Sequence, residues 1–329
     1  MRQAAYVGGL LGLVLLAVLF MRGDFSAMLQ TLKSARFTLL WLVPYRALYF
    51  LLYTIGWQNL LRPYDRRHRA GFGYLFWATS VREGIDRLLP VASVGGGVIG
   101  VRLLRWRGIA AGPAGASVIV EIVLTLIVLY AFTALGLLLL VDVRAAGHEY
   151  TRFLLVFLLT LPVPGVVVLL LLYGSVFERL QRVFRPMIGQ SAFSEDALSL
   201  DRELRASLRR GWTLLLAGIL QFVAWSSASL EIWFALRLFG HPVNVSTALI
   251  LESMTQAMRH LAFVVPAGVG VQEAGLLLFG HALGISGELA LAVSMVKRIR
   301  EVLCGVPPLL SWQWMEGRRF QRLVRDAPE

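Results

Sequence analysis

The chain has 329 residues, of which 57% are hydrophobic and only 16% are charged. Together with long runs of Leu, Val and Ala, this composition excludes a soluble globular domain and indicates an integral membrane protein. The formal net charge of +12 does not indicate a nucleic-acid partner, because membrane proteins place Lys and Arg in cytoplasmic loops and the chain has no DNA- or RNA-binding motif.

Six segments are long and apolar enough to cross a bilayer, which takes about 20 residues. They are 4–21, 38–61, 113–141, 152–175, 211–238 and 288–314. The first follows Met1-Arg2 like the apolar part of a signal peptide, but no cleavage pattern follows it, so we expect a membrane span. Tryptophan is typical of span ends at the membrane interface, and several predicted ends carry one: Trp41, Trp57, Trp212, Trp233, Trp312 and Trp314.

Two further apolar segments, 72–106 and 245–283, are interrupted by helix breakers. The breakers are Pro90, Gly95, Gly96 and Gly97 in the first segment and Pro266, Gly268 and Gly270 in the second. Each pattern predicts two short helices joined by an unwound turn that serves as a hinge. We expect re-entrant hairpins that enter and leave on the same side of the membrane, with a fully crossing kinked helix as the alternative.

Basic residues gather in the loops that six crossings would place on one side of the membrane. These are the loops 62–69 and 176–210 and the C-terminal tail, whereas the loop 142–152 is close to neutral. Because short cytoplasmic loops are rich in Lys and Arg, we expect both termini to be cytoplasmic. The stretch from Ser194 to Arg210 is charged and helix-prone, which predicts an interfacial or cytoplasmic helix.

The two interrupted segments repeat one another. Glu121 follows Pro90 by 31 residues, and Lys297 follows Pro266 by 31 residues; the helix before each proline is expected to open with an arginine, Arg82 or Arg259. The chain therefore divides into an N-terminal membrane repeat, 1–141, and a C-terminal membrane repeat, 142–329. Three crossings separate equivalent elements, so the halves would be inverted relative to the membrane, which is typical of transporters.

The glycine run also matches the pattern G-x-G-x-x-G over Gly95–Gly100, but no strand and helix of a βαβ unit surround it, so we exclude a dinucleotide site. A glycine turn that opens a helix can bind an anion through its free N–H groups, with Arg102 and Arg105 adding charge. The alternative is that the glycines only permit a tight turn and that the arginines reach the membrane surface.

Four charged residues lie near the centre of the last predicted span: Lys297, Arg298, Arg300 and Glu301. A charge that faces lipid at mid-membrane costs about 2.5–3.5 kcal/mol, so most of the four must face inward. Lys297 can pair with Glu301 four residues on, and the other candidate partners are Glu121, Glu231, Glu252 and Glu273. The cluster is either an ion-pair network that locks helices together or the wall of a polar cavity that passes a lipid head group.

Sites for catalysis are not evident. The chain has no Walker A loop, its five histidines show no metal-ligand spacing, and Cys304 lies alone in an apolar segment. We therefore expect no enzymatic activity, no catalytic or metal site and no cofactor.

The stretch Pro266-Ala267-Gly268-Val269-Gly270-Val271-Gln272-Glu273, followed by Lys297-Arg298-Ile299-Arg300-Glu301 and Trp312-Gln313, resembles the lysylphosphatidylglycerol synthase transmembrane, or flippase-like, family. Within that family the chain is most similar to membrane proteins associated with hopanoid biosynthesis. The resemblance implies lipid translocation across the bacterial inner membrane, with a hopanoid or an anionic or aminoacylated phospholipid as cargo. Two-domain relatives carry a synthase domain after this membrane part; we expect no aminoacyl transfer from this chain, which ends at Glu329.

Residues and resemblance together predict an all-α polytopic membrane protein, with six spans and two re-entrant hairpins around a central polar cavity. Its partners are membrane lipids, and a non-transporting scaffold for lipid-biosynthesis enzymes is the alternative function. The residues expected to bind the head group are Arg82, Arg102, Glu121, Arg259, Gln272, Glu273, Lys297, Arg298, Arg300 and Glu301.

Overall fold

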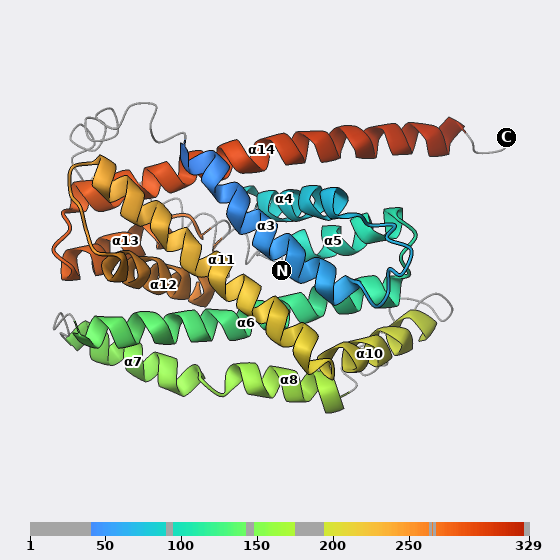
Figure 1. Ribbon diagram of the computed structural model, residues 1–329, viewed down its shortest axis with the longest axis horizontal. Coiled ribbons are helices and arrows are strands. Elements are labelled where there is room, and N and C mark those ends of the chain that lie inside the picture. Colours follow the sequence, from blue (N-terminus) through green and yellow to red (C-terminus); the bar gives the residue numbers. More distant parts are fainter. Residues whose placement is uncertain are drawn as a thin grey trace.

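A computed structural model describes residues 41–89, 95–142, 148–174, 194–262, 265 and 268–325. Within these ranges the chain is all-helical and contains no strand, as expected (Figure 1). The helices are α3 (Leu42–Leu61), α4 (Phe72–Leu88), α5 (Gly95–Trp106), α6 (Ala111–Asp142), α7 (His148–Thr160), α8 (Val163–Tyr173), α10 (Ser194–Leu208), α11 (Gly211–Leu238), α12 (Val245–Leu261), α13 (Val271–Ala282) and α14 (Gly287–Arg325).

Three helical stretches of the described chain are long and apolar enough to cross a membrane: Ala111–Leu140, Leu154–Tyr173 and Gly211–Leu238. They match three of the predicted spans. The predicted spans 38–61 and 288–314 fall largely on α3 and within α14, and both helices contain buried charges, Arg46 on α3 and Lys297 on α14. The predicted first span, 4–21, lies outside the described residues.

Two of the predicted spans differ from the observed helices. The span 152–175 is divided into α7 and α8 by a turn at Leu161-Pro162, because proline has no N–H group for the helix ladder. The helix that contains the predicted last span does not end at 314, since α14 continues through the basic tail to Arg325. Its 39 residues make a helix about 58 Å long at 1.5 Å per residue, well beyond a hydrocarbon core of about 30 Å.

Each interrupted segment forms two short helices, as predicted. The helices α4 and α5 pack against one another, as do α12 and α13. Gly268 and Gly270 have left-handed backbones, with φ of 58° and 79°, so this turn requires glycine. The hinge residues Pro90 and Pro266 lie outside the described residues.

Two local expectations were wrong. Gly95, Gly96 and Gly97 form the first turn of α5 and not an unwound turn. Arg82 and Arg259 lie in the second halves of α4 and α12 and do not open these helices, which begin at Phe72 and Val245. The helices start earlier because the residues before each arginine are mostly apolar or small and contain no proline.

Helices of each predicted half pack against helices of the other half. In Figure 1 the α4–α5 pair and the α12–α13 pair lie at opposite ends of the molecule, between α6 and α14, and α3 and α11 run side by side. The helix α4 packs on α14, and α12 packs on α6. Leu309 and Trp312 of α14 reach the core around α4 and α5, and Leu137 and Leu140 of α6 belong to the core around α12 and α13.

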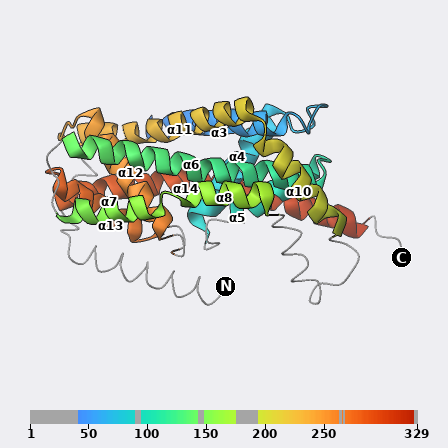
Figure 2. The same cartoon turned by 90° about the horizontal axis from the view of Figure 1, so that it is seen from below.

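The predicted helix at Ser194–Arg210 is present as α10, which packs on α6 and α8 at one end of the molecule (Figure 2). The hydroxyl group of Tyr64, in the turn after α3, lies 2.7 Å from the Ser207 hydroxyl oxygen and donates to the Glu203 carbonyl at 3.0 Å. These bonds fix α10 to the turn that joins α3 and α4.

Candidate functional site

A polar cavity of about 260 Å³ lies where the two interrupted helix pairs approach one another. Side chains of α3, α4, α6, α11 and α12 line it, together with Gly97, Val265 and Gly268. Its polar and charged wall consists of Tyr49, Tyr53, Arg82, Glu83, Asp86, Arg87, Thr125, Trp225, Arg259 and His260. A cavity with this wall inside a membrane protein is a candidate functional site.

On the N-terminal side of the cavity, Arg82 of α4 pairs with Glu121 of α6. Arg82 Nη1 lies 2.6 Å from Glu121 Oε2, and both side chains are buried. The guanidinium group also stacks over the Trp57 ring at 4.4 Å. Trp57 is therefore fully buried and does not mark a span end at the membrane interface, as its position had suggested.

Glycine makes the room for this arginine. A Cβ atom on Gly100 of α5 would lie 2.8 Å from Arg82 Cδ, closer than real contacts allow. The same relation recurs on the C-terminal side, where a Cβ atom on Gly268 would lie 2.7 Å from Arg259 Nε. Each arginine side chain therefore occupies space that is left free because the neighbouring element has a glycine at this position.

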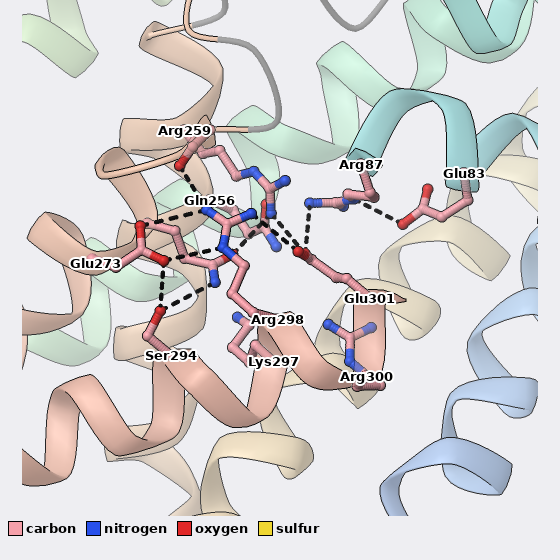
Figure 3. Close-up of polar contacts among 12 residues, drawn as sticks. Glu83, Arg87, Gln256, Arg259, Glu273, Ser294, Lys297, Arg298, Arg300 and Glu301 are labelled. Atoms are coloured by element: carbon pink, nitrogen blue, oxygen red, sulfur yellow. Dashed lines mark hydrogen bonds and ion pairs between the residues drawn. The ribbon is translucent and has the colours of Figure 1, made fainter. Parts of the chain in front are cut away.

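Glu301 of α14 joins both sides of the cavity (Figure 3). Its carboxylate accepts hydrogen bonds from Arg259 of α12 and Arg298 of α14, each at 3.2 Å, and lies 3.8 Å from Arg87 of α4. Arg87 in turn donates to Glu83 at 2.9 Å. One buried carboxylate therefore links α4, α12 and α14.

Glu273 is the second carboxylate of this side. It accepts from Arg298 Nε at 3.1 Å and from the Ser294 hydroxyl at 2.9 Å (Figure 3). It also accepts from the Gly270 N–H at 2.8 Å. Gln272 accepts from Arg259 Nη1 at 2.9 Å. The first turn of α13 is thereby tied to α12 and α14.

Lys297 does not pair with Glu301, as the four-residue spacing had suggested. Its Nζ lies 2.5 Å from Oε2 of Glu252 on α12. Lys297 faces α12 while Glu301 faces the two arginines, so packing between helices overrides the local pair. Arg300 forms an ion pair with Glu231 of α11 at 3.2 Å.

The ion pairs continue to the other end of the cavity. Glu231 lies 4.0 Å from Arg46 of α3, and Arg46 donates to Glu83 at 3.1 Å while stacking on Tyr49 at 3.6 Å. We refer to these paired side chains and Asp86 together as the buried charge network. Its basic and acidic members are equal in number: Arg46, Arg82, Arg87, Arg259, Lys297, Arg298 and Arg300 against Glu83, Asp86, Glu121, Glu231, Glu252, Glu273 and Glu301.

The predicted anion site at the glycine run is not free. The Gly96 N–H donates to Asp86 Oδ1 at 2.9 Å, so a carboxylate of the chain already occupies this helix end. A Cβ atom on Gly96 would lie 2.6 Å from the Arg82 carbonyl oxygen, which shows that the glycine permits close packing of α4 and α5. Arg102 is exposed and pairs with Glu316 of α14, and Arg105 is exposed as well, so neither reaches the cavity.

Apart from Arg102, the residues predicted to bind the head group all belong to the buried charge network or, like Gln272, bond to it. Sequence reasoning missed Arg46, Glu83, Asp86, Arg87 and His260. The rule that an intramembrane charge marks a site would have found Arg46, and Glu83 and Arg87 stand four apart on one helix face. Nothing in the sequence distinguished His260 from the other histidines.

Among the described residues, no group of three or more His, Cys, Asp and Glu side chains could hold a metal ion. Residues 6–306 match the family model of the lysylphosphatidylglycerol synthase TM region. No curated protein and no solved structure matches the chain.

Proposed function

Because the chain belongs to the lysylphosphatidylglycerol synthase transmembrane family, we propose that it is a membrane lipid transporter that moves a polar head group through the polar cavity while the hydrocarbon tails stay in the bilayer. The observation that carries this proposal is the cavity of about 260 Å³ walled by charged side chains of both interrupted helix pairs. In hydrocarbon a polar head group has no hydrogen-bond partners, whereas the cavity wall offers several, among them Arg82, Glu83 and Arg259.

The proposed topology has six spans, two re-entrant hairpins and two inverted halves, with both termini on the cytoplasmic side of the bacterial inner membrane. It is supported by the two interrupted helix pairs and by their matched packing, α4 on α14 and α12 on α6. In transporters of this architecture, substrates bind where discontinuous helices of the two repeats meet. The cargo we propose is a hopanoid or an anionic or aminoacylated phospholipid.

One observation favours a second candidate function. Every basic side chain of the buried charge network has an acidic partner, as a structural lock between helices requires. A membrane scaffold that gathers lipid-biosynthesis enzymes would need such a lock and no moving parts. In either function we propose that the chain itself catalyses no reaction.

A flipping assay in proteoliposomes distinguishes the two functions. Fluorescent phosphatidylglycerol and a labelled hopanoid are supplied in separate vesicles, and the fraction accessible to an external quencher is followed with time. We expect wild-type protein to move one of the lipids, and Glu301→Gln and Glu273→Gln to slow this movement at least tenfold. The control is Arg102→Ala, which removes an exposed ion pair outside the cavity and should move lipid at the wild-type rate.

Each variant is compared at equal protein content and after its melting temperature in detergent has been measured. No movement of either lipid by wild-type protein, with or without an imposed proton gradient, would refute the transporter and favour the scaffold. Recovery of a new lipid species from the vesicles would instead show an enzymatic activity.

A further inference from the structure

The polar cavity has an apolar neighbour. A groove of about 190 Å³ lies between α6, α7 and α12, and we call it the chain groove. Its wall is formed by side chains such as Tyr130, Val156, Phe157, Ala257 and Leu261. We propose that one hydrocarbon chain of the transported lipid lies in the chain groove while its head group lies in the polar cavity, with His260 at the boundary; this inference rests on the proposed function.

Continuity between the two spaces is the first argument. Leu126, Leu129 and His260 line both the polar cavity and the chain groove. The two spaces therefore meet at these three side chains. Five charged side chains line the polar cavity, whereas no Asp, Glu, Lys or Arg lines the chain groove and most of its wall is apolar. This is the division that a single amphipathic ligand requires.

The boundary itself carries groups suited to the polar backbone of a lipid. His260 Nδ1 lies 2.8 Å from the Gln256 carbonyl oxygen, and since a carbonyl only accepts, Nδ1 carries the proton and Nε2 of the neutral ring is left as an acceptor. The ring packs on Trp225 at 5.4 Å. Trp225 also lines the polar cavity, and its buried Nε1–H has no acceptor within the described parts of the chain. A donor and an acceptor are thus available beside the apolar groove.

The exposed apolar side chains beside the groove favour hydrocarbon as its occupant. The neighbouring side chains of α7 point outward, with Leu155, Leu158 and Leu159 between 52% and 81% exposed. In a membrane protein such leucines contact lipid tails, so a chain in the groove would be continuous with the bilayer.

The class of ligand follows from this geometry. It is a lipid with a flexible hydrocarbon chain, joined to a head group that both donates and accepts hydrogen bonds. A water-soluble solute fills only the polar cavity, and a hydrocarbon without a head group fills only the chain groove.

The test uses the full-length protein in nanodiscs that contain phosphatidylglycerol with a diazirine in the middle of one acyl chain. After illumination, labelled peptides are mapped by mass spectrometry. We expect labels to concentrate in peptides that contain Leu129–Thr133, Val156–Thr160 and Ala257–Leu261. In Thr160→Trp, which fills the groove, labelling of Ala257–Leu261 should fall at least fivefold.

The matched control is Leu159→Trp on the same helix, because Leu159 is 81% exposed and does not line the groove. It should leave labelling of Ala257–Leu261 within twofold of wild type. Equal labelling in the Thr160→Trp and Leu159→Trp proteins would overturn the proposal.

A protein occupant of the groove is tested separately. In a Cys304→Ser background, Thr160→Cys is combined with single cysteines along 4–21, and efficient disulfide formation with any of them would also overturn the proposal. Labelling does not depend on transport, so a labelled protein that moves no lipid would refute the proposed function and leave the lipid site intact.

Discussion

Lys297 and Glu252 form a buried pair whose partners lie on different helices, and each is at most 4% exposed. Breaking such a pair leaves a charge without a partner, which typically costs about 3–5 kcal/mol. We expect Lys297→Ala to lower the thermal stability of the detergent-solubilised protein sharply. The double variant Lys297→Met/Glu252→Gln should recover most of the loss, since it leaves no isolated charge; the melting temperature by intrinsic fluorescence measures both.

The exposed pair Arg102–Glu316 supplies the control for Lys297. Exposed ion pairs contribute about 0–1 kcal/mol, so Arg102→Ala should melt close to wild type. If Lys297→Ala melts as Arg102→Ala does, then Lys297 is not part of a structural lock.

Gly268 combines a left-handed backbone with close contact to Arg259. Gly268→Ala should displace the Arg259 guanidinium and weaken its bond to Glu301, because a methyl group cannot share that space. We expect a loss of at least tenfold in lipid movement together with a lower melting temperature. Gly240→Ala is the matched control: Gly240 has φ of 78° but open space around its Cβ position, so it should show the backbone strain without the effect on transport.

At the level of single residues, the cost of placing a charge in hydrocarbon predicted that most charges of the last predicted span face inward. All four of them belong to the buried charge network. That cost could not predict their partners. Lys297 had an acidic residue four positions away in Glu301, yet pairs with Glu252, which is 45 positions away. Which distant helix faces a given side chain depends on packing that no local pattern encodes.

Among the elements, the crossing of α4 and α14 is a close approach that a single substitution can test. A Cβ atom on Gly84 would lie 3.0 Å from the Gly305 carbonyl oxygen and 3.2 Å from Leu309 Cγ. Overpacking typically costs about 1–3 kcal/mol, so Gly84→Val should lower the melting temperature and separate α4 from α14. A double electron–electron resonance distance between spin labels on the two helices would measure the separation.

Gly73 lies on the same helix and nothing lies within 4 Å of its Cβ position. Gly73→Ala should be neutral or stabilise by up to about 1 kcal/mol, because alanine has the higher helix propensity. Equal melting temperatures for the Gly84→Val, Gly73→Ala and wild-type proteins would contradict the close crossing.

The sequence predicted that the segments 72–106 and 245–283 would each form two short helices, and they do, although Gly95, Gly96 and Gly97 lie inside α5. Hydropathy did not predict the end of α14, because it shows only where the apolar residues stop. The helix continues since Arg318 and Arg319 are good helix formers. Arg318 also stacks on Trp314 within α14, and Arg319 lies over the Trp106 ring at the end of α5. The break between α7 and α8 was missed because Pro162 lies in an otherwise uninterrupted apolar run.

The arrangement of the whole molecule in the membrane is tested by cysteine accessibility. In a Cys304→Ser background, single cysteines replace exposed arginines: Arg66, Arg209, Arg318 and Arg152. The proposed topology puts the first three on the cytoplasmic side, so an impermeant maleimide should label them in spheroplasts only after lysis. Arg152→Cys should react in intact spheroplasts; the reverse pattern, or equal labelling of all four, would rule the topology out.

The equal numbers of basic and acidic side chains in the buried charge network have an electrical consequence. A membrane potential of 100 mV acts on each elementary charge that crosses it with about 2.3 kcal/mol. Since the formal charges cancel, a rigid displacement of the whole network transfers no net charge across the membrane. Under the proposed transport function, such a displacement is electrically silent, and the response of lipid movement to an imposed potassium diffusion potential should report only the charge on the head group.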